Sequence, residues 1–101
     1  MSSASIQAGD EGMLHLRGEV VIASVPKLLT EAEGLFAGGP QIVVDLAEVT
    51  RVDSSGLALM LEWLQLARAQ NISLRFRNIP SSLLRIARLS NVEGLLPLAE
   101  G

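Results

Sequence analysis

The fold of this chain follows from one stretch of sequence, Val49-Thr50-Arg51-Val52-Asp53-Ser54-Ser55-Gly56-Leu57-Ala58-Leu59-Met60-Leu61. A β-branched apolar run at 41–46 precedes it and predicts a buried strand. An apolar stretch without Pro or Gly continues from it to Gln70 and predicts a helix. Between the two we expect a short polar loop, with the helix opening on Asp-Ser-Ser-Gly. Because a helix start leaves backbone N–H groups unpaired, Asp53 or Ser54 is expected to be the N-cap.

Length and composition predict one small domain. The chain has 101 residues, of which 49% are apolar and 19% charged, so a globular domain is favoured over a disordered chain. Aromatic residues make up 3%, so the core must consist of Leu, Ile, Val and Ala. The absence of cysteine excludes disulfides and thiolate metal sites. We expect a single domain over residues 1–101, with the small and polar residues 1–12 flexible.

The sequence pattern predicts no secretory signal, no membrane-spanning segment and no nucleic-acid partner. The first residues lack the basic and apolar runs of a secretory signal, and no apolar stretch reaches the about 18 residues that span a bilayer. The net charge is −3, and the arginines are interpreted as scattered with acids among them. A nucleic-acid-binding surface usually needs a concentrated basic face, so no such partner is expected.

The elements around the central stretch predict an α/β fold. Alternation at 13–17 predicts a half-buried strand, and residues 19–22 a second short strand after Gly18. A helix at 25–36 is expected to have Ser24 as its N-cap. A strand at 73–77, a helix at 83–89 capped by Ser81 or Ser82, and a short closing segment complete the chain. Strands alternating with helices predict a small, mostly parallel sheet with helices mainly on one side.

The helix at 57–70 is apolar on more than one side, which leaves two interpretations. In the first, part of its apolar surface is exposed and binds a partner. In the second, the helix is apolar on several sides without any role in binding. Under the first interpretation the docking face follows from steps of three and four residues. It comprises Ser55, Leu59, Glu62 and Gln65, with the small Ala58 beside them.

The two serines likewise have a structural and a functional interpretation. An N-cap stabilises a helix by about 1 kcal/mol and needs only one hydroxyl or carboxylate, so capping explains the presence of one of Asp53 and Ser54 but not of the neighbouring polar groups. A phosphate on Ser55 would add about −1.5 to −2 charge beside unpaired N–H groups, which the helix start would tolerate. A partner pressed against that spot would not tolerate a buried, unpaired charge. The local chemistry therefore permits a binding switch.

Catalytic and metal chemistry find little support. Asp45 and Asp53 bracket the predicted loop and suggest Mg²⁺, but two carboxylates without a phosphate cradle favour loop capping, and no metal or cofactor is expected. His15 is the only histidine, and nothing in the sequence brings it near Ser54 as serine catalysis requires. A phosphate-binding Gly-Lys-Ser/Thr loop is also missing, so an enzyme is not expected.

Three further side chains have open interpretations. Arg85 and Arg88 lie one turn apart and could contact lipid head groups or an acidic partner, although a solvated helix face is the default. Trp63 is expected in the core, although Trp is frequent in interfaces.

The central stretch resembles the signature of STAS domains, a family named for sulfate transporters and anti-sigma-factor antagonists. The resemblance is carried by Val52-Asp53-Ser54-Ser55-Gly56-Leu57 after the apolar strand at 42–46, and in element order it covers nearly the whole chain. It implies the STAS fold. In the antagonist branch a dedicated kinase phosphorylates the second serine of Asp-Ser-Ser-Gly, here Ser55.

Other residues look like a second branch, the cytoplasmic STAS subunit of the maintenance-of-lipid-asymmetry ABC transporter, which moves phospholipid between envelope membranes. The similar segments are 51–53 leading into 56–61, the helix at 62–67, and the later segments 78–83, 89–92 and 95–97. In that subunit the residue matching Ser54 is usually a Thr important for function, and a Gly is expected where this chain has Ser55.

The resemblance implies a non-catalytic adaptor in the cytoplasm, held at the inner membrane through the transporter complex. Its partner would be the ABC ATPase subunit and, indirectly, the permease. The implied contacts are Asp53, Ser54, Ser55, Gly56, Ala58, Leu59, Glu62 and Gln65. The alternative is an anti-sigma-factor antagonist switched by phosphorylation of Ser55, and a weaker third option is a small nucleotide-binding protein.

Overall fold

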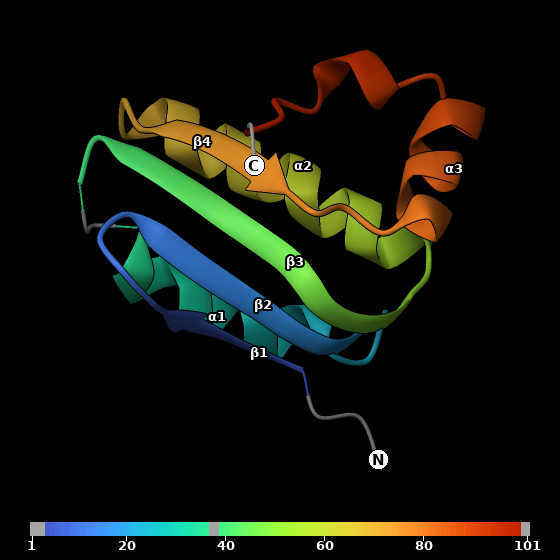
Figure 1. Cartoon of the computed structure of the whole chain (residues 1–101), viewed down its shortest axis with the longest axis horizontal. Coiled ribbons are helices and arrows are strands. Elements are labelled where there is room, and N and C mark those ends of the chain that lie inside the picture. Colours follow the sequence, from blue (N-terminus) through green and yellow to red (C-terminus); the bar gives the residue numbers. More distant parts are fainter. Residues whose placement is uncertain (1–3, 37–38, 100–101) are drawn as a thin grey trace.

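A four-stranded sheet frames the computed structural model, which describes residues 4–36 and 39–99. The strands lie in the order β1-β2-β3-β4 (Figure 1). β1 is antiparallel to β2, whereas β3 is parallel to both of its neighbours. The predicted small, mostly parallel sheet is therefore confirmed. The strand bounds are Ser5–Ala8 for β1, Met13–Val20 for β2, Gln41–Val52 for β3 and Ser73–Arg77 for β4.

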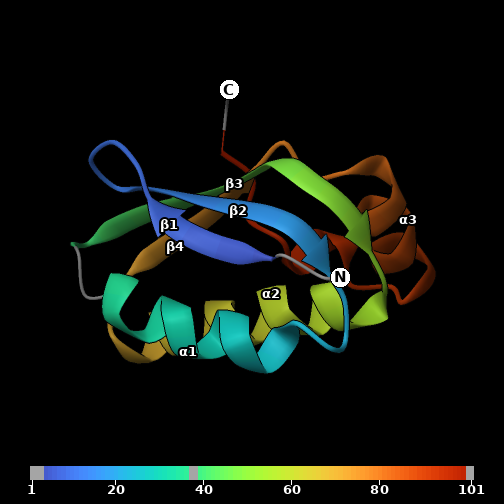
Figure 2. The same cartoon turned by 90° about the horizontal axis from the view of Figure 1, so that it is seen from below.

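Two helices cover one face of the sheet. α1 (Val25–Leu35) and α2 (Ser54–Ala69) lie beneath the strands in Figure 2, so the prediction of helices mainly on one side is confirmed. α3 (Ser81–Leu89) and the 3₁₀ turn η1 (Glu93–Leu95) follow β4 and lie at one margin of the molecule. Among the described residues no helix combines the length and apolar character needed to cross a bilayer.

The core fills the space between the sheet and the two helices. Inward-facing strand residues such as Leu16, Val44 and Phe76 pack there against the helices. Trp63 of α2 is fully buried, with its ring centroid 6.0 Å from that of Phe36, so its predicted place in the core is confirmed. Within the part of the chain that the structure describes, no helix covers the opposite face of the sheet (Figure 2).

The amino-terminal part of the chain differs from the prediction. Residues 1–3 lie outside the described residues, but residues 5–8, expected to be flexible, form β1. Ala4 and Ile6 are buried in the core, and Ile6 lies opposite Leu16 of β2, so apolar burial and pairing with the edge of β2 order the segment. The expected second strand at 19–22 is also wrong: β2 is continuous to Val20 and has an irregular register at Gly18.

The predicted polar loop before α2 is in fact strand. β3 extends to Val52 because Val49 and Val52 pair with Gly18 and Val20 of β2. The polar residues of that segment are exposed on the extended strand, which made them look like a loop in the sequence. Strand and helix are thus separated by Asp53 alone.

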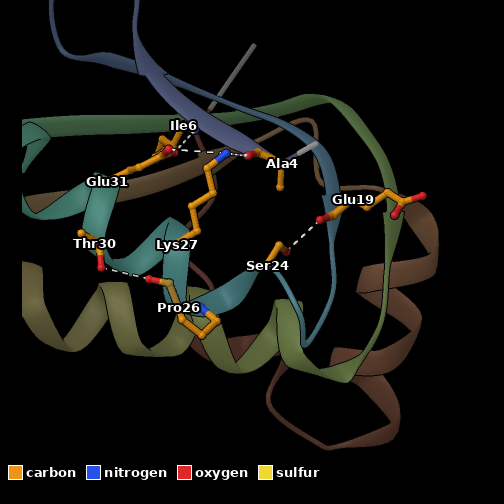
Figure 3. A network of polar contacts seen from close by, with 8 residues as sticks. All are labelled: Ala4, Ile6, Glu19, Ser24, Pro26, Lys27, Thr30 and Glu31. Atoms are coloured by element: carbon orange, nitrogen blue, oxygen red, sulfur yellow. Dashed lines mark hydrogen bonds and ion pairs between the residues drawn. The ribbon is translucent and has the colours of Figure 1, made fainter. Parts of the chain in front are cut away.

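Both edges of the sheet are tied by other segments. At β1, the backbone N–H of Ile6 donates to Glu31 Oε1 of α1 (3.2 Å), and Lys27 Nζ donates to the Ala4 carbonyl (2.6 Å), as Figure 3 shows. At β4, the Phe76 N–H donates to the Pro97 carbonyl, and the Phe76 carbonyl accepts from the Ala99 N–H. Side chains therefore protect one edge and the chain's own tail protects the other.

Two helix starts differ from the expected capping. Ser24 occupies the N-cap position of α1, but its hydroxyl donates to the Glu19 carbonyl (2.8 Å) instead of accepting from the helix (Figure 3). α3 begins at Ser81 after Pro80, without a side-chain cap from Ser81 or Ser82.

Candidate protein-docking surface at the start of α2

A single residue, Asp53, connects β3 to α2 and shapes the candidate site. Its Oδ1 accepts from the Ser55 backbone N–H (2.8 Å), and its backbone carbonyl accepts from the Gly56 N–H (3.0 Å). Of the two predicted N-caps, Asp53 is therefore the one used. Ser54 is left exposed at the first helical position.

The second oxygen of Asp53 joins a loop to this helix start. Asp53 Oδ2 accepts from the backbone N–H of Ile22 (3.3 Å), which follows β2. The Ile22 side chain is 74% exposed and so presents apolar surface beside the helix start. Sequence reasoning missed this residue because it placed Ile22 in a strand, and nothing local to the sequence links it to Asp53.

Gly56 supports the site from inside and is not a contact residue. It is buried, and a Cβ there would lie 3.2 Å from the Val20 carbonyl oxygen. The glycine lets α2 start close against the end of β2. Its predicted role in binding a partner directly is corrected accordingly.

The docking row predicted along α2 needs one further correction. Leu59 is 1% exposed, because it belongs to the stripe that faces the sheet together with Leu57, Met60 and Trp63. The exposed row starts from Ser54 and not from Ser55. It comprises Ser54, Ala58, Glu62 and Gln65, which with Ile22 we call the docking surface.

Ser55 is half-buried, and its surroundings are less favourable to a phosphate than the sequence suggests. The N–H groups of residues 55 and 56 already donate to Asp53, and the Asp53 carboxylate lies beside them. A phosphate on Ser55 would add charge next to that carboxylate and compete for its N–H donor. Modification would therefore weaken the cap as well as repel a partner.

Most of the apolar surplus of α2 is buried. Of its large apolar side chains Leu66 is the most exposed, at 37%, and Leu61 and Leu64 are half-buried. The interpretation of a greasy core helix thus accounts for most of these residues. The exposed row of α2 therefore carries the hydroxyl of Ser54, the methyl group of Ala58, the carboxylate of Glu62 and the amide of Gln65.

Asp45 lies elsewhere, on the face of the sheet without helices. Its Oδ1 accepts from the Ala47 N–H (2.9 Å) and from Asn78 Nδ2 (3.0 Å), and its Oδ2 lies 3.8 Å from His15 Nδ1. Burial raises the pKa of this carboxyl, but the two hydrogen bonds and the charges of Arg77 and His15 outweigh burial and lower the pKa below 3.8. Asp45 therefore ties β3 to the segment after β4.

Asp45 and Asp53 cannot share a metal ion. The segment between them is extended strand, which advances roughly 3.3 Å per residue. Within residues 4–36 and 39–99, no group of three or more His, Cys, Asp or Glu side chains is arranged to hold a metal. His15 lies beside Asp45 and not beside Ser54.

Comparison with known proteins places the fold in a family. A family model described as "Mlab, STAS domain" matches residues 4–97, so the chain belongs to the STAS domain family. A curated relative, the anti-sigma-B factor antagonist of Bacillus subtilis (strain 168), is 22% identical over 86 residues. That alignment covers 85% of this chain and 79% of the relative.

Solved structures of anti-sigma-factor antagonists share the same fold. An antagonist from Mycobacterium paratuberculosis superposes with a TM-score of 0.75 at 18% identity, covering 100% of this chain and 87% of the other. The anti-sigma-factor antagonist SpoIIAA in its unphosphorylated form superposes with a TM-score of 0.71 at 13% identity, and the match covers 97% of this chain and 89% of SpoIIAA. The phosphorylated form of SpoIIAA from Bacillus superposes with a TM-score of 0.69 at 15% identity, and the match covers 97% of this chain and 92% of the other.

Proposed function

We propose that this chain is a non-catalytic adaptor that binds another protein through the docking surface at the start of α2. One observation carries the proposal. The segment between strand and helix is reduced to Asp53, whose carboxylate accepts from the backbone N–H groups of Ser55 and Ile22. It therefore joins the helix start, where Ser54 is exposed, to the loop that bears Ile22. A rigid, mixed polar and apolar surface of this kind suits protein recognition.

One candidate partner is an anti-sigma factor. The relatives and solved structures that carry a functional name are anti-sigma-factor antagonists, and one of them was solved in a phosphorylated form. These names support the antagonist role more directly than any other. In this role a phosphate on Ser55 would place charge against the partner and weaken the Asp53 cap, so the modified chain would be released.

The second candidate partner is the ATPase subunit of a phospholipid-transporting ABC complex, with the permease bound indirectly. The description of the matching family model, "Mlab, STAS domain", and the resemblance of 51–53 and 56–61 to that subunit support it, although Ser55 stands where that subunit is expected to have Gly. In this role Ser54 would be the hydroxyl in contact with the ATPase, and Ser55 would need no modification.

A matched pair of substitutions tests the docking surface. Glu62→Arg reverses a charge on the exposed face of α2, and Glu33→Arg makes the same change on the exposed face of α1. We expect Glu62→Arg to abolish co-purification of the partner and Glu33→Arg to preserve it, with unchanged circular dichroism for both. An intact complex with Glu62→Arg would contradict the proposal.

Mass spectrometry of the partner captured by the wild-type chain then separates the two candidates. A serine kinase or anti-sigma factor would support the antagonist role, and an ABC ATPase the transporter role. Ser55→Asp, a partial mimic of the phosphate, should release the partner in the first case.

A further inference from the structure

Basic residues are concentrated in one part of this acidic chain. Between Glu62 and Glu93 there is no acidic residue, although the whole chain has 11 of them and a net charge of −3. The same stretch contains five of the 8 basic residues. The expectation of scattered arginines is therefore wrong. We call these five residues the basic edge: Arg68, Arg75, Arg77, Arg85 and Arg88.

The residues of the basic edge come from three elements on the β4 side of the sheet, away from β1 (Figure 1). Arg68 at the end of α2 and Arg75 of β4 lie at one end of this side, and α3 with Arg85 and Arg88 lies at the other. Arg68, Arg75 and Arg85 are exposed, and none of them forms an ion pair or a side-chain hydrogen bond with another described residue. Arg77 is half-buried and its charge acts on Asp45. Arg88 pairs with Glu93 at 3.2 Å. The charges of the basic edge that are exposed and unpaired among the described residues are therefore those of Arg68, Arg75 and Arg85.

Two of these arginines line a hollow with an apolar wall. Arg68 and Arg75 border a depression of about 500 Å³ between the end of α2 and the start of β4. Its apolar lining is supplied by Leu64, Ala67, Ile72, Leu74 and Pro97. Positive charge and apolar surface thus occur together.

Exposed leucines accompany the basic edge. Leu89 at the end of α3 is 82% exposed, Leu95 in η1 is 63% exposed and Leu98 in the tail is 59% exposed. In the described part of the chain the other large exposed apolar residues are Ile22 and Leu66. The elements that follow β4 therefore combine exposed arginines with exposed leucines.

From this combination we propose that the basic edge is a second interaction surface and that it binds the surface of an anionic lipid bilayer. Arginines are attracted to anionic head groups, and adjacent leucines can enter the interface. Single-stranded nucleic acid fits less well, because the aromatic residues Phe36, Trp63 and Phe76 are all buried and offer no base-stacking platform. The phosphate backbone of a duplex would give the exposed leucines no apolar partner. The contact is peripheral and reversible. It uses none of the docking-surface residues, so it does not depend on the proposed function.

Sedimentation of the full chain with vesicles tests this proposal. We expect binding to phosphatidylcholine vesicles that contain phosphatidylglycerol, little binding to phosphatidylcholine alone, and weaker binding at high salt. Arg85→Glu combined with Arg88→Glu should weaken the partition into anionic vesicles by about tenfold or more. Leu89→Ser should weaken it as well, since that side chain is exposed and its loss costs the fold little.

A second double variant is the matched control. Arg17→Glu combined with Arg51→Glu gives the same net charge but changes exposed residues outside the basic edge, so it should keep most of the binding. Equal loss in the two double variants would show an effect of overall charge and overturn the proposal. Failure of the folded wild-type chain to bind anionic vesicles would also overturn it, leaving an acidic protein segment as the occupant to consider.

Discussion

Helices α2 and α3 each follow a parallel strand, yet they begin in different ways. The carboxylate of Asp53 caps α2 and ties it to the loop at Ile22. α3 follows Pro80 without a side-chain cap, and its approach is held from a distance by the bond from Asn78 to Asp45. Thus an aspartate serves each helix: Asp53, which follows β3, at the start of α2, and Asp45, within β3, at the segment leading to α3.

The two helices also differ in what they bury. α2 places six residues in the core, whereas α3 buries only Leu83 and Ala87. Helix α2 therefore contributes to both the core and the candidate site, so a substitution in α2 can affect stability and binding together. α3 can vary at its surface with little effect on the core, which is consistent with a helix available for a separate contact.

The largest effect should come from the buried side of α2. Trp63→Ala removes a fully buried ring that packs on Phe36, and we expect it to lower the free energy of unfolding by about 3–5 kcal/mol. Leu89→Ala at the exposed end of α3 should change it by less than about 0.5 kcal/mol. Denaturant unfolding measures the free energy of unfolding of both variants. Similar losses would show that the two helices do not differ in their contribution to the core.

The next effect concerns the close approach of α2 to β2. Gly56→Ala should cost about 1–3 kcal/mol, because its Cβ would meet the Val20 carbonyl oxygen at 3.2 Å. Gly34→Ala in α1 is the matched control, since a Cβ there meets nothing within 4 Å. It should stabilise the chain by about 0.5–1 kcal/mol. If both alanines stabilise the protein in thermal unfolding, the proposed close contact is wrong.

A smaller effect should distinguish the two helix starts directly. Asp53→Ala removes the cap of α2 and should cost about 1–2 kcal/mol. Ser82→Ala at the uncapped start of α3 should be close to neutral. Thermal unfolding compares the two variants, and hydrogen exchange at the Ser55 and Ile22 amides should quicken in Asp53→Ala only. Unchanged exchange there would remove Asp53 as the link between loop and helix.

The smallest effect concerns acid stability at the segment leading to α3. Because folding lowers the pKa of Asp45 from 3.8, this carboxylate contributes stability that is present above the unfolded-state pKa and is lost as pH falls through the folded-state pKa. Asp45→Asn should therefore flatten the decline of unfolding free energy with pH below about 4. Unfolding curves over that range measure it, and an identical slope in variant and wild type would exclude this contribution.

Sequence alone predicted the elements whose signals are local. The apolar run at the start of β3, the long helix α2 and the alternation in β4 are each visible within a few residues, and the motif at 52–57 indicated the family. Order along the chain was enough to predict a mostly parallel sheet covered mainly on one side.

The remaining features depend on contacts between distant residues. β1 is ordered by pairing with β2, by burial of Ile6 and by Glu31 of α1, which a four-residue segment with one large apolar side chain does not reveal. The orientation of Leu59 could not be read from a helix that is apolar on several sides. The contact of Ile22 with Asp53 joins positions far apart in sequence, so the sequence could suggest residues on one helix for the candidate site but not Ile22 beside them.

The hydrogen bonds at the two edges of the sheet limit how this protein can bind other proteins. A backbone donor of β1 is engaged by a glutamate of α1, and both polar groups of Phe76 are engaged by the tail. A partner therefore cannot extend the sheet by adding a strand at either side without first displacing part of the chain. Recognition is left to side chains on helices and on the bare sheet face, and the same arrangement discourages copies of the chain from joining edge to edge into fibrils.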